Sequence, residues 1–158
     1  MTHDARSVAN AMIQKGIDAG DPLTPLQVIK LTYLCQAWML GMFGEPMFDQ
    51  KVEAWQYGPV IADVYHGIKH NRGRPVRKPM RARPAVFDEF EQHIIDQVYG
   101  EYGKRDGIYL SQLTHMPGSP WYETKQENPL GINQEISEEK MKRYYAEKLE
   151  QSEERDSG

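Results

Sequence analysis

The chain has 158 residues, which fits one domain with enough length for a hydrophobic core. Its 27% of charged residues and moderate apolar content are typical of a folded protein, and a net charge of −4 argues against a surface built entirely for nucleic acid. No apolar run reaches the length of a membrane span, and no signal-peptide pattern opens the chain. Its single cysteine, Cys35, cannot form an internal disulfide. These features predict a cytoplasmic protein.

The first two helices are marked by apolar spacing and by capping residues. Apolar residues at helical spacing predict a first helix over residues 4–19. Thr24 then caps a second helix, and Gln27 completes a capping box with it. The second helix is apolar around most of its circumference, which predicts the central core helix of the fold. We expect it to end at Gly41 and Gly44.

Residues 53–60, with the sequence Glu-Ala-Trp-Gln-Tyr-Gly-Pro-Val, form the most informative segment. The segment is too apolar for a solvated loop and too broken for a helix interior. Its Gly-Pro pair predicts a sharp turn, with Pro59 starting a third helix over residues 59–69. Trp55 and Tyr57 each have an apolar body to bury or to present to a partner. The segment is typical of a recognition or packing element, which favours binding over catalysis.

A basic stretch follows, with seven Lys and Arg residues and no acid. These are Lys69, Arg72, Arg74, Arg77, Lys78, Arg81 and Arg83. Because residues 70–84 are rich in Pro and Gly, we expect an exposed, mobile loop. Three alternatives are open for such a loop: it is simply solvated, it docks on an acidic protein surface, or it contacts the phosphates of a nucleic acid. It lacks interleaved aromatic residues and any nucleic-acid-binding signature, which argues against nucleic acid. Acids outnumber bases in residues 135–156, so the molecule is polarised in a way that suits steering of a charged partner.

The C-terminal half predicts further helices separated by turns. They span residues 88–102, residues 108–115, a short stretch that starts at Ser119 and Pro120, and residues 138–150 after a Ser137 cap. We expect a turn at residues 128–131 and a polar, frayed tail at residues 151–158. The predicted fold is a compact, single-domain, mainly α bundle of about six or seven helices. It has at most a short extended, hairpin-like segment.

Candidate catalytic and metal-binding residues are few. His66 and His70 lie four residues apart, but no Glu stands beside the first and no third ligand is apparent, so we interpret them as structural or surface histidines. His115 has no obvious nucleophile or carboxylate beside it. We therefore predict that its side chain donates a hydrogen bond that holds the turn before Trp121. Phosphate-binding glycine loops and the common hydrolase and metal motifs are missing, so we expect no enzyme, cofactor or metal site.

Several motifs together resemble the Panacea antitoxin domain family, which includes SocA-like and GepA-like phage-associated proteins. The matching stretches are residues 23–34, 37–38, 44–48, 53–60, 64–65, 113–115 and 120–121. The motif residues are Glu53, Trp55, Tyr57, Gly58, Pro59, Leu113, Thr114, His115, Pro120 and Trp121. The resemblance covers about residues 5–127, and we expect the domain to occupy residues 5–150. It implies a mainly helical fold and no active site.

The resemblance implies an antitoxin that neutralises a cognate toxin protein by direct binding in a toxin–antitoxin system. The alternative is a phage or prophage accessory protein that binds a host defence factor or acts as a proteolytic adaptor. Candidate partner contacts are Tyr57, Tyr65 and Trp121 as aromatic anchors, with Arg74, Arg77 and Arg81 steering the approach. We expect neither a membrane nor nucleic acid as partner. The oligomeric state, and whether the motif belongs to the core or to the interface, stay open.

Overall fold

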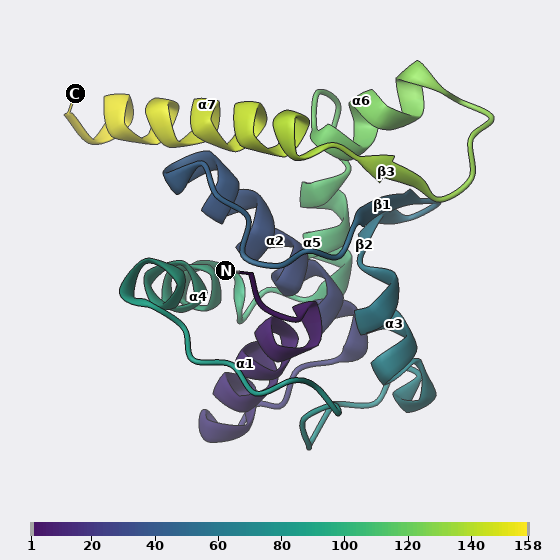
Figure 1. Ribbon diagram of the computed structural model, residues 1–158, viewed down its shortest axis with the longest axis vertical. Helices are drawn as coiled ribbons and strands as arrows, with labels where there is room; N and C mark the ends of the chain where they lie inside the picture. Colours follow the sequence, from purple (N-terminus) through teal and green to yellow (C-terminus); the bar gives the residue numbers. More distant parts are fainter. Residues whose placement is uncertain (1, 158) are drawn as a thin grey trace.

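A computed structural model describes residues 2–157 of the chain. In chain order the elements are α1 (Ala5–Asp18), α2 (Pro25–Phe43), β1 (Val52–Trp55), β2 (Gly58–Val60), α3 (Ala62–Ile68), a 3-10 turn η1 (Lys69–Asn71), α4 (Glu89–Tyr102), α5 (Gly107–Thr114), α6 (Pro120–Glu127), β3 (Gln134–Ile136) and α7 (Glu138–Ser157). The predicted mainly α fold is confirmed, with a small sheet added at one side (Figure 1).

Helix α2 is the centre of the fold and is buried along almost its whole length. Helix α7 makes the most extensive contact with it, and α1, α4 and α5 pack around its other sides (Figure 1). The start of α2 follows the predicted capping box. Thr24 Oγ1 accepts a hydrogen bond of 3.3 Å from the Gln27 amide, and Gln27 Oε1 accepts one of 2.8 Å from the Thr24 amide. Two backbone N–H groups at the helix end thereby gain partners.

The predicted end of α2 is right at Gly44 and wrong at Gly41. Gly44 takes a left-handed φ of 75° just after Phe43, the position where glycine is favoured at a helix end. Gly41 lies inside the helix. A Cβ on Gly41 would lie 2.6 Å from Tyr145 Cβ and 2.8 Å from the Tyr145 carbonyl carbon. Gly41 therefore allows the backbones of α2 and α7 to approach closely at their crossing.

The sheet has the order β2-β1-β3 and both pairings are antiparallel. Pro59 lies within β2, so the prediction that it starts a helix is wrong. The reason is that residues 58–61 are buried in extended form, and α3 begins only at Ala62. A proline is tolerated here because β2 is an edge strand. Strand β3 was not predicted.

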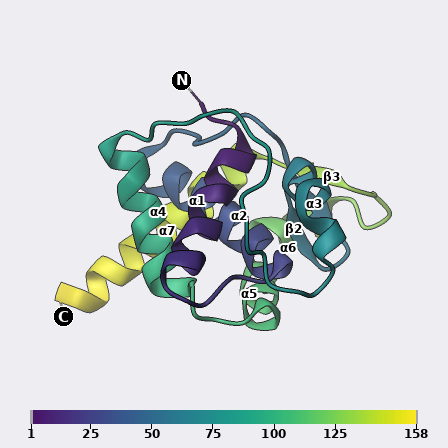
Figure 2. The same ribbon diagram turned by 90° about the horizontal axis from the view of Figure 1, so that it is seen from below.

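The chain ends in a longer helix than the sequence suggested. Helix α7 continues to Ser157, so residues 151–157 are helical where a frayed tail was predicted. Glu, Gln and Arg dominate this stretch, and these residues are good helix formers even when they are exposed. The end of α7 projects beyond the body of the molecule (Figure 2). The predicted domain boundaries at residues 5 and 150 stay predictions.

Candidate functional site

The basic stretch is anchored on α1 rather than hanging free. The Asn10 side chain makes two hydrogen bonds with the backbone of Met80, accepting from its amide at 2.7 Å and donating to its carbonyl at 2.8 Å. The Val76 amide donates to the Leu23 carbonyl at 2.7 Å, and the Val76 side chain is buried. The Ser7 hydroxyl donates to the Arg83 carbonyl. The predicted exposure is confirmed for the cationic side chains, while the apolar residues between them are packed.

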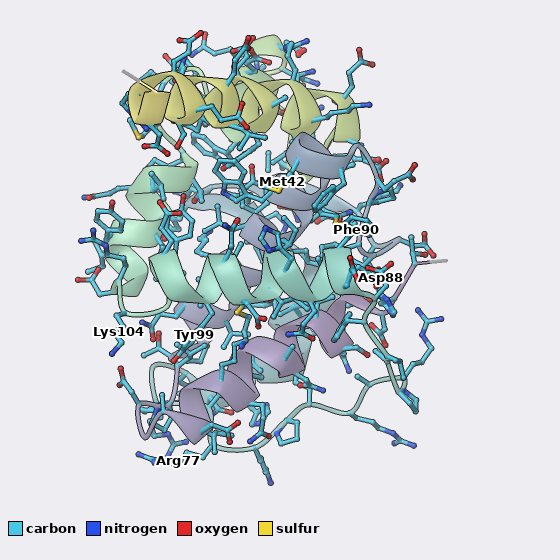
Figure 3. All side chains as sticks on the ribbon, turned by 90° about the vertical axis from the view of Figure 1, so that its left-hand side faces the viewer. Met42, Arg77, Asp88, Phe90, Tyr99 and Lys104 are labelled. Carbon is cyan, nitrogen blue, oxygen red and sulfur yellow. The ribbon has the colours of Figure 1, made fainter. Side chains whose placement is uncertain are left out.

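These anchors fold the stretch into a groove of about 710 Å³ at the end of α3, which we call the basic groove. Its cationic lining residues are Arg74, Arg77, Lys78 and Arg81, and its apolar ones include Ile68, Val76 and Met80. The structure therefore brings together all three arginines that the sequence analysis selected for steering. Arg77 projects from the lower edge of the molecule (Figure 3).

The cations of the basic groove are available to a ligand. Within residues 2–157, no carboxylate lies within ion-pair distance of Arg74, Arg77, Lys78 or Arg81, whereas Arg83 lies 3.8 Å from Asp4. Exposed guanidinium groups that have no carboxylate partner can bind a carboxylate or a phosphate through two parallel hydrogen bonds. Next to apolar lining residues, they suit an acidic segment that also carries an apolar side chain.

The aromatic motif residues form a packed cluster between the hairpin and the helices around it. The Trp55 and Tyr65 rings meet edge to face at 5.0 Å, and Trp55 Nε1 donates to Glu53 Oε1 at 2.8 Å. Trp121 Nε1 donates to the Trp55 carbonyl at 2.6 Å, and its ring lies 5.3 Å from that of His115. Trp55, Tyr65 and Trp121 are half-buried, so this part of the motif joins β1, α3 and α6 together.

The remaining motif residues divide between core and surface. Thr114 and Pro120 are buried, Leu113 is half-buried, and Gly58 takes a φ of 130° beside Lys30. Tyr57 is the exception, because 73% of its surface is exposed at the turn between β1 and β2. Of the three aromatic anchors proposed from the sequence, Tyr57 alone is largely free to meet a partner.

The predicted hydrogen bond from His115 is wrong. Among the described residues, the buried Nδ1 of His115 has no hydrogen-bond partner. The ring instead supports Trp121 by contact, because the two rings are tilted against each other at the junction of α5 and α6.

The sequence analysis missed Lys30, which is 1% exposed on α2. Its Nζ donates a hydrogen bond of 3.0 Å to the Pro59 carbonyl and has no ion-pair partner among the described residues. Burial lowers the pKa of Lys30 to about 8. The signal was present, because Lys30 is the one charged residue within Pro25–Phe43, a helix that is otherwise buried on nearly every side.

His66 and His70 are both exposed, so they are surface histidines. No group of three His, Cys, Asp or Glu side chains within residues 2–157 is placed to hold a metal ion. None of the described helices combines the length and apolar character needed to cross a bilayer.

Comparisons with known proteins place this geometry in context. The family described as "Antitoxin SocA-like, Panacea domain" matches residues 28–122, which include most of α2, the hairpin, the basic groove and the aromatic cluster. The chain is also similar to the antitoxin SocA of Caulobacter vibrioides, with 28% identity over 128 residues, covering 75% of this chain and 68% of that protein. No solved structure is significantly similar to the chain.

Proposed function

Because the chain belongs to the SocA-like Panacea antitoxin domain family, we propose that it is a non-catalytic antitoxin that neutralises a cognate toxin protein by binding it directly. The family match over residues 28–122 carries this proposal. The proposed mechanism is occlusion or conformational trapping of the toxin. An interface of ordinary size, on the order of 800 Å² per partner, is sufficient for such a complex.

The basic groove is the surface that we assign to the toxin. Its cations are not neutralised by carboxylates of the chain itself within the described residues, and its lining includes apolar side chains that exclude water from a bound segment. An acidic segment of the toxin fits both properties. Charges of one sign gathered in a hollow speed up the approach of an oppositely charged partner and favour one docking orientation.

The test is co-expression of the chain with the product of the neighbouring open reading frame. We expect that product to arrest growth alone, and the chain to restore growth and to copurify with it. A triple variant, Arg74→Gln, Arg77→Gln and Arg81→Gln, is expected to lose most of the rescue. The matched control replaces three exposed cations outside the groove: Lys51→Gln, Lys104→Gln and Arg155→Gln.

Three outcomes would count against the proposal in different ways. If the neighbouring product does not arrest growth on its own, it is not a toxin. Growth rescue without a complex contradicts direct binding. Capture of a host protease or defence protein, with no neighbouring product in the complex, would favour the accessory or adaptor role instead. Equal rescue by the triple variant and the control would mean that the toxin binds directly, but at a surface other than the basic groove.

A further inference from the structure

Three large apolar side chains are exposed at one end of the small sheet. Tyr57 is 73% exposed, and Leu130 and Ile132 are 92% and 85% exposed. Tyr57 belongs to the turn between β1 and β2, while Leu130 and Ile132 belong to the loop of residues 128–133 that connects α6 to β3. Exposed apolar residues that are scattered singly are normal, whereas exposed apolar residues that gather at one place are typical of interaction sites.

The strand register brings the turn and the loop to the same end of the sheet. Ala54 of β1 pairs with Gln134, the first residue of β3, and Trp55 pairs with Gly58 of β2. The β1–β2 turn and the residues that precede Gln134 must therefore leave the sheet on the same side. Figure 1 shows this arrangement at the right-hand edge of the molecule. We call Tyr57, Leu130 and Ile132 the sheet-end patch.

The loop of residues 128–133 has a defined shape. The Gly131 amide donates to the Asn128 carbonyl at 3.0 Å, which closes a tight turn. The Gln134 side chain lies over Gly131, where a Cβ would clash with its carboxamide group. Asn133 takes a left-handed φ of 51°, a conformation that Asn tolerates better than most residues. The base of the loop is tied to α7 by an ion pair of 2.6 Å between Glu127 and Lys140.

We propose that the sheet-end patch is a hydrophobic anchor that inserts into an apolar cleft of the partner protein. The three side chains are largely exposed on two turns, so the partner must supply the hollow that surrounds them. Each aliphatic side chain transferred from water into such a cleft adds a favourable hydrophobic contribution to binding. The inference rests on the proposed function for the identity of the partner, and it adds a contact that the basic groove does not include.

Charge and size favour a protein cleft over other occupants. Residues 126–135 contain two acids, Glu127 and Glu135, and no cation. Anchoring on an anionic membrane surface uses flanking Lys and Arg, so this loop does not fit it. A stable dimer buries on the order of 800 Å² per subunit, which three side chains on two turns cannot supply alone, whereas the toxin is proposed to cover the basic groove as well.

The experiment compares the double variant Leu130→Ser and Ile132→Ser with Val86→Ser in the full chain. Val86 is a matched control because it is also an aliphatic residue with 92% exposure, and it lies just before α4. The dissociation constant for the copurified toxin is measured by calorimetry. We expect the double variant to bind about tenfold or more weakly and Val86→Ser to bind like the wild type. Both variants should keep the wild-type melting temperature, because the replaced side chains lie on the surface.

Each other result overturns the inference in a distinguishable way. Equal affinity of the double variant and the wild type removes the sheet-end patch from the interface and leaves the proposed function standing. Failure of the wild type to bind any toxin overturns both. A wild-type dimer that becomes monomeric in the double variant shows that a second copy covers the patch. Wild-type flotation with phosphatidylcholine–phosphatidylglycerol vesicles, lost in the double variant, shows that a membrane covers it.

Discussion

The indole Nε1 of Trp121, in the first turn of α6, donates a hydrogen bond of 2.6 Å to the backbone carbonyl of Trp55 at the end of β1. The bond joins two motifs that lie 66 residues apart in the sequence. It gives the Trp55 carbonyl, next to the β1–β2 turn, a side-chain donor from a distant segment, and a hydrogen bond of this kind contributes about 0.5–1.5 kcal/mol to stability. The two tryptophans thus hold the hairpin against α6, and the position of Tyr57 depends on them.

Replacement of Trp121 by Phe is therefore expected to lower the free energy of unfolding by about 1–3 kcal/mol. The Trp55 carbonyl loses its indole donor, and the His115 ring loses part of its contact. Urea denaturation measures the change. The control is Tyr57→Ala, which removes an exposed ring at the turn and should change stability by about 0.5 kcal/mol or less. A Trp121→Phe protein as stable as the wild type would show that the bond contributes nothing net.

Alanine substitutions at two helical glycines are expected to change the stability of the protein in opposite directions. Gly41→Ala places a Cβ within 3 Å of the Tyr145 backbone, so α2 and α7 must move apart, at a cost of about 1–3 kcal/mol. Gly100→Ala adds a Cβ that meets no atom within 4 Å, and alanine stabilises a helix relative to glycine by up to about 1 kcal/mol. Thermal unfolding of both variants checks the prediction. A lower melting temperature for both, or for neither, contradicts the assignment of Gly41 to the helix crossing.

The helices could be predicted from the sequence because their signals are local. Asp88, for example, accepts a hydrogen bond from the Glu91 amide at the start of α4, and both residues of this capping box can be recognised in the sequence. Strand β3 has no comparable signal. Its residues are Gln134, Glu135 and Ile136, and they become a strand because β1 lies beside them. A pairing across such a distance in the chain leaves no periodic pattern in three residues.

The candidate site was predicted in part for the same reason. The charge run that forms the basic groove can be counted along the chain, so Arg74, Arg77 and Arg81 were found. Burial of Tyr65 and Trp121 follows from contacts with Trp55, which join distant segments and which the sequence does not reveal. The same limit applies to the sheet-end patch, since only the register of β3 brings its loop beside the hairpin turn.

Neutralising the basic groove is expected to change the rate of association with the toxin more than the rate of dissociation. Exposed charges act at long range and are screened by salt over about 10 Å at 0.1 M. We expect Arg74→Gln, Arg77→Gln and Arg81→Gln together to slow association about tenfold at low salt and to flatten its dependence on salt. Stopped-flow mixing at two ionic strengths measures this. A variant whose association keeps the wild-type salt dependence would exclude steering by these arginines.

The buried Lys30 predicts an unusual dependence of stability on pH. Burial lowers the pKa of the folded protein's Lys30 from 10.5 to about 8. Below pH 8 the folded and unfolded chains both bind the proton, so the slope from this group is zero. Between about pH 8 and 10.5 the unfolded chain binds more protons than the folded one, and stability therefore rises with pH. The full rise from Lys30 is about 3 kcal/mol.

Replacement of Lys30 by Met is expected to abolish this rise and to stabilise the protein at pH 7, because an unpaired buried cation is exchanged for an apolar chain of similar length. The lost hydrogen bond to Pro59 offsets about 1 kcal/mol of the gain. Burial raises the pKa of Cys35 and Tyr145 in both proteins, which lowers stability above about pH 9 equally in each. The difference between their urea-denaturation curves from pH 7 to 10 therefore isolates Lys30, with exposed Lys104→Met as the control. Parallel stability curves would show that the Lys30 ammonium is better solvated than its burial indicates.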